Sequence, residues 1–262
     1  MAGNGWLGLE QEADDRWRLP ITEGVISGAS ALFGGCATAA AIAVARTVAE
    51  QPVVYAVSHF GALAQLGTTV TITSKVIAAG RTLTHLEVEG RFDDKHSFLT
   101  RVTAGSRPAQ NAAGQWVNAP ELSSVESSES FVHPVHEGTW AERFEWRLAT
   151  VDAAARPTAA WWVRPLDPNV DPFLTGPILV DYVTYGVGRA LGVPMGGLSV
   201  DNVVRVHRPT EAEWYLLVVT PEAIDEGLGY GTARLYADGT LTMTGTQSIV
   251  VNGWDWRLPD ER

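Results

Sequence analysis

Three polar residues in the second half of the chain could form a reactive site. Asp181 lies near the start of the segment ILVDYVTYGVGRAL, which is otherwise mostly apolar, so its carboxylate must be either a satisfied cap or a functional group. Ser199 opens a later strand-like stretch together with Asp201, and Gln247 lies within the last such stretch. A sheet wrapped around the helix would bring these side chains to the helix N-terminus. Spacing alone leaves a purely structural role open.

Nucleophilic catalysis has weaker support. A serine elbow requires the pattern GxSxG, and the nearest segment, Gly28-Ala29-Ser30-Ala31-Leu32, lacks the second glycine. Cys36 lies in the first turn of a predicted helix, where the helix dipole favours a thiolate. No histidine is near it in the sequence, and small buried thiols are commoner than reactive ones. We therefore predict a structural role for Cys36.

Metal and phosphate sites are not expected. His133 and His136, with Glu137 beside them, have a spacing that metal ions sometimes use, but they lie in a polar stretch with no evident third or fourth ligand. The glycine-rich run Gly227 to Gly231 opens a strand, so no helix N-terminus would hold a phosphate there. The sequence thus predicts no cofactor and no metal.

Composition restricts the class of protein. The 262 residues suffice for one large or two small domains, and 45% hydrophobic with 19% charged residues indicate a globular chain. The 19 basic and 30 acidic side chains give a net charge of -11, which disfavours nucleic acid and anionic membrane surfaces as partners. A single cysteine, an acidic N-terminal stretch and the lack of a run near the about 20 residues of a membrane span predict a cytoplasmic protein.

The first half reads as one helix followed by strands. Residues Leu32 to Glu50 are rich in helix formers, apolar on nearly all sides, and followed by Pro52, which predicts a buried helix. Stretches rich in Val, Thr, Ile and aromatics predict the strands of an antiparallel meander; they are Val53 to Phe60, Thr68 to Ala78, Leu83 to Phe92 and Ser97 to Ala104.

The second half repeats this order after a polar linker. Between Gly105 and Gly138 the sequence turns to Ser, Glu, Asn, Pro and Gly. Two strand-like pieces and a predicted helix, Gly176 to Leu191, follow. The strand-like segments of this half are Glu142 to Thr150, Thr158 to Arg164, Leu198 to His207, Trp214 to Thr220, Leu228 to Tyr236 and Leu241 to Val251.

An internal duplication explains the repeated order of elements. A curved antiparallel sheet around one buried helix is the hotdog architecture, so we predict an α+β double hotdog. Its parts would be an N-terminal hotdog over residues 1–104, a linker over 105–140, and a C-terminal hotdog over 141–262 that carries the site. One large α+β sandwich of another type is the alternative.

Short segments over nearly the whole chain resemble those of double hotdog proteins of the acyl-CoA thioesterase II type. In the first half these are Leu32-Phe33-Gly34-Gly35 and Ala79-Gly80-Arg81-Thr82. The second half has Ala160-Trp161-Trp162-Val163-Arg164, Asp181, Leu198-Ser199-Val200-Asp201, Val206-His207-Arg208-Pro209, Glu213-Trp214, Leu235-Tyr236-Ala237-Asp238-Gly239 and Thr246-Gln247, in the order and approximate spacing of the family.

The resemblance implies hydrolysis of an acyl thioester, most simply acyl-CoA in fatty acid metabolism, by an activated water. The family's aspartate, hydroxyl and glutamine fall on Asp181, Ser199 and Gln247. The carboxylate would act as general base, while the hydroxyl and amide would position the water. Backbone N–H groups at a helix start would stabilise the oxyanion. Asp201 matches a family acid with a structural role.

The chain departs from the family pattern in two places. Ser199 stands where a threonine is usual, which keeps the hydroxyl but loosens its rotamer. The first half has Ala64-Gln65-Leu66-Gly67 in place of a proline-containing turn, and nothing in it matches the Asp and Gln of the second half. We therefore expect one active site per chain. The expected substrate-binding residues are Gly34, Gly35, Trp161, Trp162, Arg205 and Arg208.

Two other functions compete with hydrolysis. One is a non-hydrolytic acyl-thioester or lipid binder that kept the fold, which would not need the three intact polar residues. The other is a hotdog dehydratase or hydratase, which typically has a histidine in or beside the central helix, and neither predicted helix contains one. The paired rings of Trp161 and Trp162 could line an acyl tunnel or pack at a subunit contact. Exposed sheet edges favour a homodimer or a higher homo-oligomer.

Overall fold

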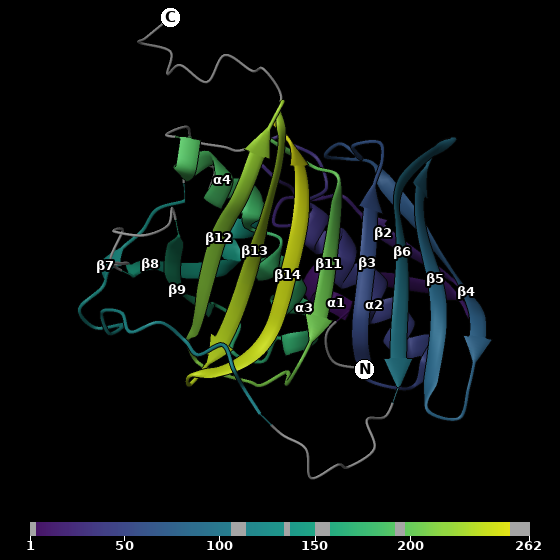
Figure 1. Ribbon diagram of the computed structural model, residues 1–262. Helices are drawn as coiled ribbons and strands as arrows, with labels where there is room; N and C mark the ends of the chain where they lie inside the picture. The colour runs from purple at the N-terminus through teal and green to yellow at the C-terminus, as the bar shows by residue number, and fades with distance from the viewer. Residues whose placement is uncertain (1–3, 106–113, 134–136, 150–157, 192–196, 252–262) are drawn as a thin grey trace, which may run out of the picture.

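One long, curved antiparallel sheet dominates the protein (Figure 1). The computed structural model describes residues 4–105, 114–133, 137–149, 158–191 and 197–251. Its 14 strands include the continuous order β1-β2-β4-β5-β6-β3-β11-β14-β13-β12-β9-β8-β7, and β10 also pairs with β14. Their bounds are β1 (Glu10–Ala13), β2 (Arg16–Pro20), β3 (Val53–Phe60), β4 (Thr69–Ala79), β5 (Leu83–Phe92), β6 (Lys95–Gly105), β7 (Glu129–Ser130), β8 (Phe144–Ala149), β9 (Ala159–Pro165), β10 (Leu198–Ser199), β11 (Asp201–Val206), β12 (Tyr215–Asp225), β13 (Leu228–Ala237) and β14 (Thr240–Val250).

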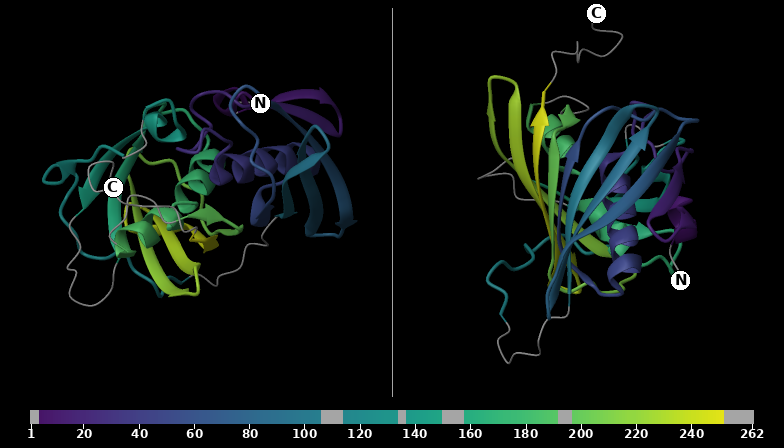
Figure 2. Two further views of the ribbon diagram at one scale, coloured as in Figure 1. Left: turned by 90° about the horizontal axis from the view of Figure 1, so that it is seen from above. Right: turned by 90° about the vertical axis from the view of Figure 1, so that its right-hand side faces the viewer.

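The main helices lie together on one side of this sheet (Figure 2). They are α2 (Gly34–Ala49), α3 (Pro172–Val180) and α4 (Val183–Leu191), with a short α1 (Asn4–Leu7) and a 3-10 turn η1 (Trp140–Arg143). Helix α2 is buried from Gly35 to Ala45, as its run of alanines predicts, because small side chains allow close packing against the sheet and α3. None of the helices in the described ranges is long and apolar enough to cross a membrane.

The two halves of the chain share one topology. The first half has the strand order β2-β4-β5-β6-β3 and the second half the order β9-β12-β13-β14-β11, with the central helix inserted after the first strand of each set. The halves join where β3 pairs with β11, with Ser58 opposite Asn202. The predicted duplication and double hotdog are therefore confirmed.

The prediction of a simple meander was wrong for β3. Strands β4, β5 and β6 do follow one another in the sheet, but β3 pairs with β6 and with β11 rather than with β4. A strand's own residues predict its extended backbone but not its neighbours. Placing β3 at the junction lets it contribute hydrogen bonds to both halves and removes two sheet edges.

The second central helix also differs from its prediction over Gly176 to Leu191. It begins earlier because the Asp171 carboxylate accepts the Phe173 N–H at 2.8 Å and Pro172 occupies the first turn, a combination that favours a helix start. It is then interrupted after Val180 and resumes at Val183. Asp181 thus lies in a break between two short helices rather than inside one helix.

Residues 114–128 of the predicted linker form a strap over the outer face of the second half. Gln115 bonds the backbone of Gly239 and Leu241, and the Tyr236 hydroxyl donates to the Asn118 carbonyl. The Trp162 indole N–H donates to the Ser123 carbonyl at 2.9 Å. Beneath the strap lies a second apolar cluster, separate from the main core, formed by Ala149, Ala160, Leu216, Val218 and Tyr236.

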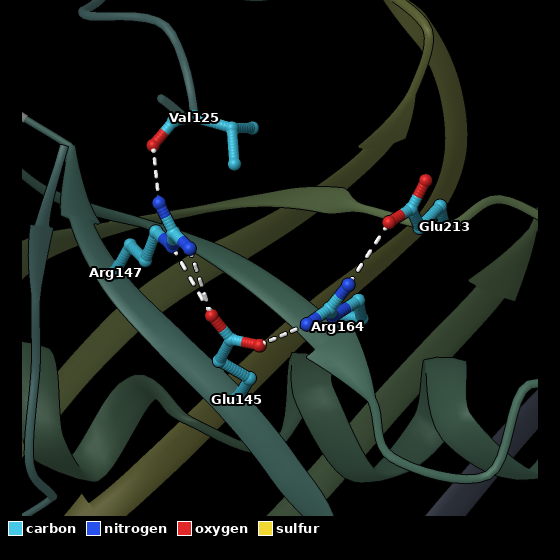
Figure 3. A network of polar contacts seen from close by, with 5 residues as sticks. All are labelled: Val125, Glu145, Arg147, Arg164 and Glu213. Carbon is cyan, nitrogen blue, oxygen red and sulfur yellow. Dashed lines mark hydrogen bonds and ion pairs between the residues drawn. The ribbon is translucent and has the colours of Figure 1, made fainter. Parts of the chain in front are cut away.

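A charged network adds another attachment for the strap (Figure 3). Arg147 donates to the Val125 carbonyl at 3.1 Å and to the Glu145 carboxylate, which also pairs with Arg164. Arg164 continues to Glu213 at 2.9 Å. Exposed ion pairs contribute little singly, so the network mainly orients the side chains that hold the strap.

Candidate active site at the junction of the two halves

The N-terminus of α2 provides hydrogen-bond donors for a site. Phe33 precedes the helix in an extended conformation, and its side chain makes no capping bond. The first hydrogen bond of the helix runs from the Ala37 N–H to the Phe33 carbonyl. The N–H groups of Gly34, Gly35 and Cys36 precede it and have no partner within the helix. Such a helix start attracts negative charge.

Asp181 packs directly against this helix start. A Cβ atom on Gly34 would lie 2.8 Å from Asp181 Oδ2, and one on Gly35 would lie 2.8 Å from the Ile178 Cα. Only glycine therefore allows the second-half helix break to approach α2 this closely. The site is consequently built from both halves of the chain.

Gln247 connects the other two candidate residues. Its side-chain N–H₂ donates to Asp181 Oδ1 at 2.5 Å and to Ser199 Oγ at 2.7 Å. Asp181 and Gln247 are fully buried, whereas Ser199 is half-buried and lines a cavity. The three residues come from the helix break, from β10 and from β14, so the fold brings them together across 66 residues of sequence.

One oxygen of Asp181 is left for a ligand. Asp181 Oδ2 is buried and has no hydrogen-bond partner of regular geometry among the described residues. Because the Ser199 hydroxyl accepts a bond from Gln247, its own hydrogen is available to donate. The two residues that Gln247 joins thus offer one acceptor and one donor, which suits a water molecule.

Burial raises the pKa of the Asp181 carboxyl well above its usual range. The Gly35 N–H and the Asn202 side chain oppose this rise, while the negative charge of Asp201 adds to it. Asp201 is itself held by the Ser248 N–H, which donates to its Oδ1 at 2.6 Å. A carboxyl with a raised pKa is a stronger base once ionised, as a general base near neutral pH requires.

A cavity opens beside Gly34 and Ser199 and is lined mainly by apolar groups. Rings form part of its wall, with Phe33 stacked on Trp140 at a centroid distance of 4.5 Å. The cavity therefore offers an apolar binding space next to Ser199. Other ring-bearing residues of the wall are Phe60, His133, Tyr182 and Tyr185.

Comparison with known proteins identifies the family. The family model of the acyl-CoA thioesterase N-terminal domain matches residues 22–105, and that of the C-terminal domain matches residues 117–251. The chain belongs to the acyl-CoA thioesterase family. It is therefore a thioesterase, an enzyme that hydrolyses acyl thioesters. No curated protein matches the sequence.

Solved structures similar to this thioesterase share its fold over almost the whole chain. A candidate thioesterase from Novosphingobium aromaticivorans is 25% identical, with a TM-score of 0.86, covering 94% of this chain and 98% of its own. The acyl-CoA thioesterase II TesB2 of Mycobacterium marinum is 15% identical, with a TM-score of 0.76, covering 96% and 98%. A hotdog protein from Alicyclobacillus acidocaldarius is 17% identical, with a TM-score of 0.83, covering 97% and 99%.

Four residues expected to bind substrate do not line the cavity of the thioesterase. Trp161 is fully buried behind Tyr182, at a centroid distance of 5.1 Å. Trp162 points to the opposite face of the sheet, where the strap covers it. Arg205 is exposed and stacks on Tyr55 from the neighbouring strand, and Arg208 is also exposed. Of the expected set, Gly34 lines the cavity and Gly35 contacts α3.

Two other side chains considered from the sequence, Cys36 and His133, are buried. Cys36 is fully buried, and burial raises the pKa of its thiol, which disfavours the thiolate that a nucleophile requires. His133 lies among the rings of the cavity wall, 5.4 Å from the centroid of Tyr182. His136 lies outside the described residues. Within the ranges described, no group of three or more His, Cys, Asp or Glu side chains is arranged to hold a metal ion.

The first half of the thioesterase has hydroxyl groups at the corresponding place. Thr38 on α2 bonds Ser58 on β3 at 2.8 Å, and Ser58 bonds Thr100 on β6 at 2.9 Å. By the repeated topology, β6 corresponds to β14 and α2 to the broken helix. These three hydroxyls are fully buried and bonded to one another, and none of them is a base comparable to a carboxylate.

Sequence reasoning did not select Tyr182 or Asn202. Tyr182 directly follows Asp181 and lines the cavity, and Asn202 is fully buried on β11 and acts on the Asp181 carboxyl. A signal for Asn202 exists, since it is a polar residue at a strand position where its neighbours Val204 and Val206 are buried. Nothing in the sequence around Tyr182 distinguishes it from a core residue.

Proposed function

We propose that the enzyme hydrolyses acyl-CoA, with Asp181 as general base and Ser199 and Gln247 positioning the attacking water. The observation that supports this is the contact of the Gln247 amide with both Asp181 and Ser199 beside the apolar cavity. The description of the family model names acyl-CoA as the thioester. The acyl group would occupy the cavity, with its carbonyl near the start of α2.

The proposed reaction proceeds in two steps. Asp181 accepts a proton from the water as the water oxygen forms a bond to the thioester carbonyl carbon, and N–H groups of the first turn of α2 stabilise the oxyanion. The carbon–sulfur bond then breaks, the carbonyl re-forms, and the proton held by Asp181 neutralises the leaving thiolate. The products are a free acid and a thiol, and the enzyme returns to its starting state without a covalent intermediate.

The test measures thiol release from a panel of short, long and aromatic acyl-CoAs. Asp181→Asn keeps the size of the side chain but removes its basicity, so kcat should fall about 10²- to 10⁴-fold. Cys36→Ala is the matched control, because Cys36 lies in the adjacent helix turn, and its kcat should stay within about threefold of the parent. Near-normal turnover by Asp181→Asn on every active substrate would refute the assignment.

Ser199→Ala and Gln247→Ala separate positioning from base catalysis. Each should lower kcat less than Asp181→Asn does. The double variant should lose less than the product of the two single losses, because both residues hold one water. Multiplicative losses would indicate two independent roles and contradict the shared-water proposal.

The same panel distinguishes the competing functions. A binder would retain acyl-CoA in calorimetry and release no thiol from any substrate. A dehydratase or hydratase would interconvert 3-hydroxyacyl and enoyl thioesters while the thiol stays attached, which absorbance of the conjugated thioester detects. Either result would replace the hydrolytic proposal.

A further inference from the structure

Aromatic rings form part of the wall of the cavity beside Ser199. Trp140 is 2% exposed and lies between two neighbours, stacked on Phe33 at 4.5 Å and edge-on to Trp146 at 5.7 Å. Tyr182, also 2% exposed, contacts Trp146 at 5.2 Å. Because these rings pack against one another and against the core, a long acyl chain could not continue past them without repacking several large side chains.

Small residues on fixed backbone also line the cavity. They include Gly28, Ala29, Gly61 and Ala62. The Gly61 and Ala62 N–H groups donate to the Ser97 and His96 carbonyls at 2.9 and 2.8 Å, which holds this segment against the sheet. The rings and the small residues together bound a space that we call the slot, and flat rings in its wall favour a planar group.

The Tyr182 hydroxyl is a polar group within the ring wall. The Tyr182 hydroxyl is buried and makes no hydrogen bond within the described ranges. Burial raises the pKa of this phenol, so it stays protonated and can donate. A saturated alkyl chain would leave this donor unsatisfied, whereas an oxygen atom on a bound group would accept from it.

We infer that the preferred acyl group is aromatic and carries a ring oxygen, with Tyr182 as the residue that recognises this oxygen. The ring would insert into the slot beside Phe33 and Trp140, and the thioester carbonyl would remain near Gly34 and Ser199. This inference rests on the proposed thioesterase site, because it places the acyl group in the cavity next to that site.

Matched probes test the shape of the slot. Phenylacetyl-CoA and octanoyl-CoA have the same number of acyl carbons, so they differ in shape rather than in size. We expect kcat/KM for phenylacetyl-CoA to exceed that for octanoyl-CoA by about tenfold or more, the range in which apolar pockets discriminate. The Kd of each probe for the Asp181→Asn variant, measured by calorimetry, gives the same comparison without turnover.

Tyr182→Phe tests the recognised oxygen. The probe is the ring-hydroxylated isomer of phenylacetyl-CoA that the parent uses best. The kcat/KM of Tyr182→Phe for this isomer should fall about tenfold, because one neutral hydrogen bond is lost. Its kcat/KM for phenylacetyl-CoA and octanoyl-CoA should stay unchanged. Tyr236→Phe is the control, since this hydroxyl bonds Asn118 under the strap, away from the cavity. An unchanged melting temperature would show that Tyr182→Phe folds normally.

The outcomes separate the two proposals. Equal or better use and binding of octanoyl-CoA would overturn the aromatic inference and leave the hydrolytic function intact. A loss in Tyr182→Phe that is equal for all probes, or absent for all, would overturn the role of Tyr182. If no probe releases thiol but Asp181→Asn binds the aromatic probes more tightly, the slot is supported and the hydrolytic proposal fails.

Discussion

Asp181 has a location that favours its reactivity and opposes its ionisation. The carboxyl is fully buried between α3 and α4, and the helix start at Gly34 and Gly35 faces it. Burial disfavours the charged form, and the Gly35 N–H and Asn202 restore part of that loss. The pKa of Asp181 should therefore be higher than that of an ordinary aspartate. Both the activity and the stability of the enzyme should change with pH as Asp181 titrates.

The activity should depend on pH through Asp181. Because only the ionised carboxylate accepts a proton, kcat/KM should rise with pH along a limb whose midpoint lies above the about 3.9 of a free aspartate. The charge of Asp201 contributes to the raised pKa, so Asp201→Asn should move this limb to lower pH while its amide oxygen still accepts the Ser248 N–H. A limb that does not move in Asp201→Asn would contradict this coupling.

The stability should depend on pH in the opposite sense. A carboxyl whose pKa is higher in the folded than in the unfolded state stabilises the fold most at low pH, and this contribution is lost as pH rises through the folded-state pKa. Asp181→Asn removes the buried charge, so it should raise the melting temperature at pH 8 more than at pH 5. Each kcal/mol gained corresponds to about 2–4 °C in a chain of this size. Equal gains at both pH values would show that charge is not the cause.

At the scale of single residues, the sequence allowed the three polar candidates to be selected but not the cavity wall. Asp181 and Gln247 are unusual because they are polar residues in apolar segments. The rings of the wall are not unusual in this way, since a tryptophan in a strand faces either side depending on register. Trp161 and Trp162 illustrate this, because adjacent strand residues point to opposite faces.

At the scale of elements, the contact between α2 and the helix break controls the geometry of the site. Gly34→Ala would place a methyl group 2.8 Å from Asp181 Oδ2 and 2.9 Å from the Phe60 ring. Overpacking of this kind costs about 1–3 kcal/mol, and here it would displace Asp181 from Gln247. We expect kcat to fall at least about tenfold, the effect of a 1.4 kcal/mol change in the barrier.

Gly5→Ala is the control for this variant. A Cβ atom at Gly5 would have no other atom within 4 Å, so neither kcat nor the melting temperature should change appreciably. If Gly34→Ala retained full activity, the close approach of α2 would not be needed for catalysis.

The limits of prediction at this scale have a physical origin. The strands with apolar positions were located within a few residues, because their patterns of burial follow from composition. Strands β1 and β2 were not predicted, and β1 is exposed at every position, so it has no apolar alternation to detect. The break at Asp181 was not predicted either, although Val180, Tyr182 and Val183 around it are weak helix formers.

At the scale of the whole molecule, the strap covers an apolar patch that the second half would otherwise expose. Trp162→Phe keeps a smaller aromatic ring but removes the N–H that bonds the Ser123 carbonyl. The strap should then open more often, and a glutamate-specific protease should cleave faster after the exposed Glu121 and Glu126. Trp116→Phe is the control within the strap, because Trp116 is 89% exposed; equal cleavage of both variants would refute the anchoring role.

Some expectations for the whole molecule stay predictions. The domain limits at 104 and 141, the homo-oligomer and the cytoplasmic location concern boundaries and surroundings that a single chain does not determine. Size-exclusion chromatography with light scattering would measure the oligomeric state directly.

The junction of β3 with β11 has a consequence for how the site responds to dilution. If the two hotdogs were separate subunits, the base from one and the helix start from the other would meet only as a concentration-dependent complex. Linking them in one chain replaces that association with an intramolecular one of high effective concentration. The composite site should therefore remain assembled at any concentration of the protein.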